Sequence, residues 1–110
     1  MKNKVILIGN VTADFQIREV GNGKKVVAGT IAVPRERDRE KADFVRFEAW
    51  NKQAENLATY VGKGSRILIE GSLRIDNYEK DGVKNSIMKV VVEKVEFLSL
   101  KKPGSETNNN

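Results

Sequence analysis

Aromatic and charged side chains alternate with apolar ones in the segment from residue 43 to residue 50. The apolar positions are Val45, Phe47 and Ala49. The positions between them carry rings and charges: Phe44, Arg46, Glu48 and Trp50. Because successive side chains of a β-strand point to opposite faces, the apolar set is predicted to face a core and the mixed set to face outward. Rings and charges together on an exposed face suit contact with a ligand that is both flat and anionic.

The segment from residue 66 to residue 78 repeats this alternation. The residues predicted to face inward are Ile67, Ile69, Leu73 and Ile75. The residues between them are mostly polar or charged: Arg66, Glu70, Ser72, Arg74, Asp76 and Tyr78. Gly71 in the middle predicts a β-bulge or a sharp bend, which can shift the phase of the second half. With the phase kept, Arg74 and Tyr78 join the outward set.

Single-stranded nucleic acid offers flat unpaired bases and anionic phosphates. Bases stack on aromatic rings, at roughly 1–3 kcal/mol per base, and lysine and arginine neutralise phosphates. We predict Phe44, Trp50 and Tyr78 as stacking residues, and Arg46 and Arg74 as basic contacts. Further cations lie in or beside predicted loops: Arg35, Arg37, Arg39, Lys41, Lys80 and Lys84. Stacking discriminates little between the four bases, so the predicted binding is non-specific. Trp50 also fits packing beside a helix, and the charged run 35–41 taken alone also fits a plain solvated loop.

Composition argues against catalysis. The 110 residues contain no cysteine and no histidine, which removes thiolate chemistry and the commonest general base and metal ligand. The sequence has no phosphate-binding glycine motif and no recognisable metal loop, so we predict no cofactor, no metal and no enzyme activity. The net charge of +5 permits a polyanionic partner. The first ten residues lack a signal-peptide pattern, and no segment has the length of a membrane span, so we expect a cytoplasmic protein with no membrane partner.

An all-β domain is predicted to position these residues. The predicted strands cover residues 4–8, 26–33, 43–50, 66–78 and 84–98. Ala54, Leu57, Ala58 and Val61 form the apolar stripe of one short helix, for which Asn51 is the predicted N-cap and Gly62 the end. This order is typical of a five-stranded Greek-key barrel of the OB type, with the helix between strands 3 and 4. An open antiparallel sheet with the helix on one face is the alternative. We expect one domain over residues 1–100 and a short disordered tail over residues 101–110.

Several segments resemble the bacterial single-stranded DNA-binding proteins in order and in spacing, and together they cover about residues 1–100. The matching segments are Asn3–Val11, Asp14–Arg18 with Gly21–Gly23, Val26–Val33, Phe44–Val61, Lys63–Ser65 and Ile69–Arg74. The run from Trp50 to Ala58 is close to the family's strand–helix signature, AWGKQAENLA. The resemblance implies an OB-fold, a homotetramer, and the wrapping of single-stranded DNA during replication, recombination and repair.

The resemblance also assigns individual residues. Phe44, Trp50 and Tyr78 fall on the family's base-stacking positions. Arg46, Lys52 and Arg74 fall on basic positions near the DNA path, and Arg37 falls near a position where some members carry a further stacking Trp. We retain two other interpretations: an OB protein of the RNA-binding or primosome type, and a structural module whose aromatic face binds a protein.

The chain departs from the family's pattern at three places. Phe15 and Glu19 stand where the family usually has Pro and Tyr, and Gly29 stands where a bulkier residue is common. The sequence ends at Asn110 without the acidic, hydrophobic tip by which family members recruit repair and replication enzymes. We therefore expect DNA binding without recruitment through such a tail.

Overall fold

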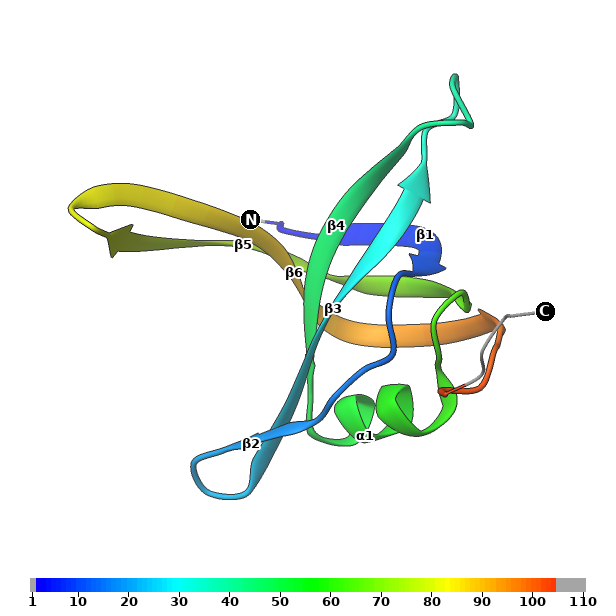
Figure 1. The fold of residues 1–110 in the computed structure, drawn as a ribbon, viewed down its shortest axis with the longest axis horizontal. Helices are drawn as coiled ribbons and strands as arrows, with labels where there is room; N and C mark the ends of the chain where they lie inside the picture. The colour runs from blue at the N-terminus through cyan, green and yellow to red at the C-terminus, as the bar shows by residue number, and fades with distance from the viewer. Residues whose placement is uncertain (1, 105–110) are drawn as a thin grey trace.

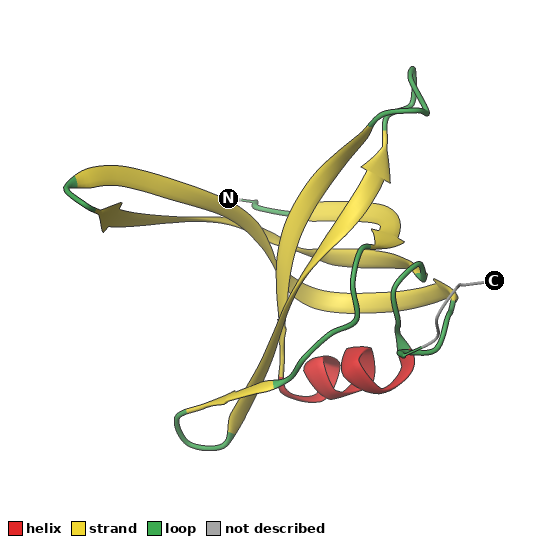
Figure 2. Cartoon of the chain, in the orientation of Figure 1, coloured by secondary structure: helices red, strands yellow, loops and turns green. Residues whose placement is uncertain are grey.

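The computed structural model describes residues 2–104, which form six strands and one helix. In chain order these are β1 (Val5–Val11), β2 (Arg18–Val20), β3 (Lys24–Pro34), β4 (Ala42–Trp50), α1 (Asn51–Tyr60), β5 (Arg66–Lys80) and β6 (Val83–Ser99). Figure 1 shows the long strands curling around one another. Figure 2 shows the helix lying across one end of them.

The five long strands close into a barrel. The sheet order is β1-β5-β6-β4-β3-β2, and an additional pairing of β1 with β3 closes the ring. The closing contacts are short: β1 meets β3 at Val11 and Ile31, and β4 runs parallel to β6 at Phe47 and Val90. The predicted five-stranded barrel, with its helix between the third and fourth long strands, is confirmed. The structure contains one strand more than predicted, β2. Two of its three residues are polar, and it pairs with β3 alone among the described strands, so the sequence pattern did not reveal it.

The core lies where the alternation of β4 and the first half of β5 predicted it. Phe47, Ala49, Ile67 and Ile69 are at most 1% exposed. Leu57 of α1 is also fully buried. The apolar stripe of the helix therefore seals one end of the barrel, and the opposite faces of these strands are left for other contacts.

The second half of β5 does not face the core, contrary to the prediction. Leu73 is 39% exposed and Ile75 is 55% exposed. The β5–β6 hairpin runs past the barrel as a two-stranded arm (Figure 1), and no other described strand pairs with that part of it. The register shifts between Glu70 and Gly71, but the extra residue, Glu93, lies in β6, because Glu70 pairs with Lys94 and Gly71 with Val92. Alternation alone cannot tell an apolar residue in a barrel from one on an arm.

The helix begins differently from the prediction. Trp50, and not Asn51, is the N-cap, and its side chain makes no capping hydrogen bond. The side-chain Oδ1 of Asn51 instead accepts a hydrogen bond from the backbone N–H of Lys25 in β3, at 3.1 Å. Gly62 follows the C-cap, Val61, as expected. A Cβ on Gly62 would collide with the backbone carbonyl of Lys102, so the close approach of the C-terminal segment requires glycine there.

The C-terminal segment is hydrogen-bonded to the barrel as far as it is described. Ser65 Oγ donates to the carbonyl oxygen of Lys101 at 3.1 Å and accepts from its N–H at 2.8 Å. The backbone N–H of Gly104 donates to Asp14 Oδ2 at 2.8 Å. Residues 101–104 belong to the predicted tail; the rest of that prediction, residues 105–110, lies outside the described residues.

Two of the departures from the family pattern pack against each other. The Phe15 ring occupies the space that a Cβ on Gly29 would fill, so the two residues are complementary. Phe15 also meets Phe47 edge to face, with ring centroids 5.8 Å apart. A ring from the segment between β1 and β2 thus fills the space beside Gly29 of β3.

Candidate nucleic-acid interface

The outward side chains of β3, β4 and β6 form one surface, which we call the candidate face. Its members are Ala28 and Thr30 of β3, Phe44, Arg46, Glu48 and Trp50 of β4, and Ile87 and Lys89 of β6. Ala28 lies opposite Glu48, and Thr30 opposite Arg46. Small side chains beside long ones leave a groove of about 370 Å³ over these strands. Arg18 of β2 lines the same groove.

The three predicted stacking rings lie at the surface. Phe44 is 69% exposed near the tip of the β3–β4 hairpin, and Tyr78 is 44% exposed on the β5–β6 arm. Trp50 is partly buried where β4 meets α1. Rings spread along β4 and the arm suit a flexible ligand that offers one flat surface after another.

The two more exposed of the predicted stacking rings, Phe44 and Tyr78, each line a hollow together with a basic residue. Tyr78 and Lys84 line a hollow of about 620 Å³ on the arm. Phe44 and Arg46 line another of about 470 Å³, which Met88 also borders. The structure therefore brings predicted stacking and basic residues together in pairs, and the pairs are distributed along β4 and the arm.

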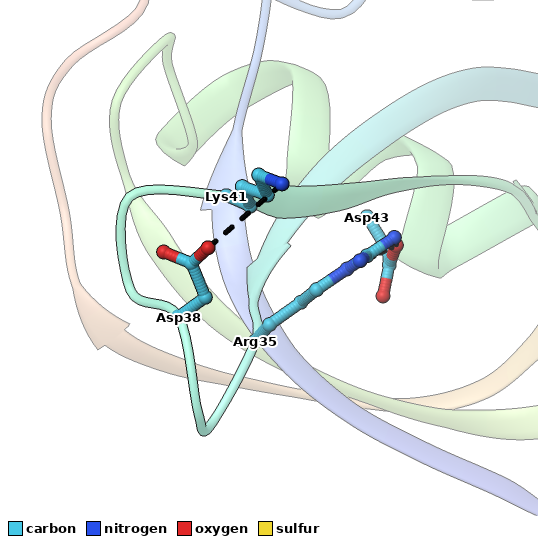
Figure 3. Close-up of polar contacts among 4 residues, drawn as sticks. All are labelled: Arg35, Asp38, Lys41 and Asp43. Carbon is cyan, nitrogen blue, oxygen red and sulfur yellow. Dashed lines mark hydrogen bonds and ion pairs between the residues drawn. The ribbon is translucent and has the colours of Figure 1, made fainter.

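The β3–β4 hairpin carries cations that are partly engaged by acids (Figure 3). Arg35 donates to Asp43 Oδ1 from Nε at 3.1 Å and from Nη2 at 2.9 Å. Lys41 Nζ lies 3.9 Å from Asp38 Oδ2. Both pairs are well exposed, so they are weak and a phosphate can replace either acid.

The basic residues predicted from the sequence fall into two groups. Arg35, Lys41 and Arg74 have carboxylate partners within 4 Å. Among residues 2–104, the others form no ion pair and are exposed: Arg37, Arg39, Arg46, Lys52, Lys80 and Lys84. The second group can meet phosphates without first breaking a contact within the chain.

Glu48 was predicted to face outward, and it does, but it is only 9% exposed. Its Oε1 lies 2.7 Å from Lys89 Nζ, and its Oε2 accepts a hydrogen bond from Trp50 Nε1 at 2.8 Å. Burial raises the pKa of Glu48, but the hydrogen bonds from Lys89 and Trp50 and the nearby charges lower it more, so the net pKa is below the ordinary value. The carboxylate is therefore ionised at neutral pH.

Sequence reasoning missed Arg18 and Lys89 as residues of this surface. Arg18 lies in β2, which was not recognised as a strand. Lys89 precedes the buried Val90 in β6, so alternation around Val90 and Val92 could have placed it on the outer face.

The described part of the chain shows no sign of a metal site or of a membrane span. No group of three or more acidic side chains that could hold a metal ion occurs within residues 2–104. No helix in that range is long and apolar enough to cross a membrane.

Comparison with known proteins finds one family. The model of the single-strand binding protein family matches residues 2–98. A single-stranded DNA-binding protein of Bacillus cereus is 40% identical over 96% of this chain and 65% of its own length. Single-stranded DNA-binding protein 3 of Listeria innocua is 36% identical over 100% of this chain and 74% of its own length. Single-stranded DNA-binding protein A of Bacillus subtilis is 37% identical over 94% of this chain and 63% of its own length. The chain thus spans slightly less than two thirds of the Bacillus relatives.

Proposed function

Because this chain belongs to the single-strand binding protein family, we propose that it binds single-stranded DNA during replication, recombination and repair. Binding is non-specific and involves no catalysis. Bases stack on Phe44, Trp50 and Tyr78, while exposed cations neutralise the phosphates. The names of the relatives that match nearly the whole chain support DNA as the ligand.

The observation that carries this proposal is the exposure of aromatic rings beside cations. Phe44 is 69% exposed, although burying its ring in a core would be favourable. Arg46 lies two residues further along β4, and the two line one hollow. A double-stranded nucleic acid hides the faces of its bases, so only an unpaired strand can use both features at once.

The basic contacts are assigned by position. Arg46 and Arg74 flank the centre of the candidate face, and Lys52 stands at the start of α1. Arg35 and Arg37 belong to the β3–β4 hairpin, while Lys80 and Lys84 belong to the arm. Cations spread over this distance can follow a phosphate backbone for several nucleotides.

We also propose that the chain forms a homotetramer in the cytoplasm, where bacterial DNA is replicated. Apolar side chains on the outer face of β1 support self-association, because Ile6 is 58% exposed and Ile8 is 47% exposed. Light scattering measures the mass. A monomer at micromolar concentration, with and without a long oligo(dT), would refute this part of the proposal and leave the DNA-binding part standing.

Titration with fluorescently labelled oligo(dT) tests the binding itself. We expect saturable binding at low salt, a fall in affinity as salt rises, and weak competition from duplex DNA. We expect an RNA strand of equal sequence to compete less well than DNA. The 2′-hydroxyl is the group by which the site would distinguish the two. Absence of oligo(dT) binding at low salt would refute the proposed function.

A further inference from the structure

A carboxylate lies at the centre of the candidate face, where a polyanion would meet it. Glu48 stands between Arg46 and Trp50 in the outward set of β4, yet only 12% of its side chain is exposed. A charge that is this well covered is costly unless it is paired. Its charged partners are Arg74 of β5 and Lys89 of β6, so two neighbouring strands supply cations to this one acid.

Two cations of β5 and β6 are held by Glu48 and one further acid. Lys89 Nζ lies 2.7 Å from Glu48 Oε1 and 2.8 Å from Asp76 Oδ2. Arg74 Nη1 lies 3.9 Å from Glu48 Oε2. Arg74 and Lys89 are partners in the β5–β6 register, a position in which like charges repel. The two acids offset that repulsion.

The charges in this cluster cancel at neutral pH. A hydrogen bond from Lys89 lowers the pKa of the Asp76 carboxyl, and hydrogen bonds to Asp76 and Glu48 raise the pKa of Lys89. Glu48, Asp76 and Lys89 are therefore ionised, and with the guanidinium of Arg74 two negative charges balance two positive ones. The cluster itself therefore adds no net positive charge to the candidate face.

The same carboxylate also holds a ring. Trp50 Nε1 donates to Glu48 Oε2 at 2.8 Å, from two residues further along the same face of β4. This bond fixes the edge of the indole that faces the cluster and leaves the rest of the ring for stacking. One side chain thus connects a stacking ring to Lys89, the cation that it holds together with Asp76.

We propose that Glu48 is a positioning residue that keeps phosphates away from the centre of the candidate face, so that bases lie there and phosphates pass along its edges. This inference rests on the proposed function. Lys89 is 22% exposed and held by two acids, so it makes no phosphate contact. The phosphates instead meet cations that form no ion pair among residues 2–104, such as Arg46, Lys80 and Lys84.

The salt dependence of oligo(dT) binding tests this inference with Glu48→Gln. Glutamine keeps the shape of the side chain, and its amide oxygen can still accept the hydrogen bond from Trp50. Lys89 then retains only its exposed partner, Asp76, which a phosphate can replace. We expect the slope of log affinity against log salt to steepen by about 0.7 for each cation released. That change is roughly an extra fivefold loss of affinity per tenfold rise in salt. In Glu48→Gln/Lys89→Met the slope should fall back by about 0.7.

Three further variants serve as controls. Glu70→Gln removes a carboxylate of β5 that is also paired with a lysine, Lys4 at 2.6 Å, but lies outside the candidate face. It should leave the slope unchanged. Lys89→Met in the otherwise unaltered chain should not flatten the slope, because Lys89 contacts no phosphate. Lys80→Met should flatten it by about 0.7, because Lys80 does.

An unchanged slope in Glu48→Gln, or a flatter slope in Lys89→Met, would overturn the inference. Equal steepening in Glu70→Gln would do the same, because it would show a general effect of charge. If Glu48→Gln does not fold, the contrast between Lys89→Met and Lys80→Met decides the question alone. Failure of the unaltered protein to bind oligo(dT) would instead refute the proposed function.

Discussion

Truncation of Phe44 separates binding from folding more cleanly than any other change on the candidate face. Its side chain is 69% exposed, so Phe44→Ala removes little buried apolar area and should leave the free energy of unfolding nearly unchanged. One base then loses its stacking partner, at about 1–3 kcal/mol. At 1.4 kcal/mol for each tenfold change, the dissociation constant for oligo(dT) should rise by about 5- to 150-fold.

Fluorescence anisotropy with labelled oligo(dT) measures this loss, and urea denaturation checks the fold. Tyr60→Ala is the matched control, because Tyr60 is an aromatic residue of similar exposure, 55%, on α1 and away from the candidate face. Phe44→Trp should bind at least as tightly as the unaltered chain, since it keeps the ring. Equal losses in Phe44→Ala and Tyr60→Ala, or no loss in either, would refute the assignment of Phe44 as a stacking residue.

Three changes test the packing and the electrostatics of the fold by urea denaturation. Gly29→Ala should destabilise the protein by about 1–3 kcal/mol, because the new Cβ collides with the ring packed against it. Gly21→Ala, with no atom within 4 Å of the new Cβ, is the control and should change stability little. Ser65→Ala should cost about 1–3 kcal/mol, because it leaves the N–H of Lys101 without its buried partner. The fold lowers the pKa of Glu48, so the stability due to this group is present above its ordinary pKa of 4.5 and is lost as pH falls through the folded-state pKa. Glu48→Gln should therefore flatten the loss of stability below about pH 4.5, and an unaltered acid profile would contradict the pairing.

A closed sheet has a single inner face, and every second residue of each strand points toward it. Alternation therefore predicted the core of the barrel. Phe47 and Ala49 of β4, and Ile67 and Ile69 of β5, are all buried as their spacing indicated. The same rule failed at Ile75, because β5 continues beyond the barrel and no segment within residues 2–104 covers its apolar side there. Alternation specifies which residues share a face of a strand. It does not specify how far along the strand that face is covered by the rest of the barrel.

Contacts between distant segments could not be read from local pattern. Arg35 is exposed, as its charged loop indicated, but its bond to Asp43 depends on how the hairpin closes. The cluster around Glu48 depends on the register of three strands, which no single segment specifies. Likewise, Phe15 and Gly29 read as two separate departures from the family pattern, and only the fold shows that one fills the space left by the other.

The proposed function places the bases on the rings of β4 and the arm. An oligonucleotide that carries 5-iodouracil can be photo-crosslinked to the protein. Mass spectrometry of the peptides then identifies the rings that contact bases. We expect adducts at Phe44, Trp50 and Tyr78, and none at Tyr60. Adducts confined to Tyr60 or to the peptide of β1, under conditions where the strand is fully bound, would contradict the account.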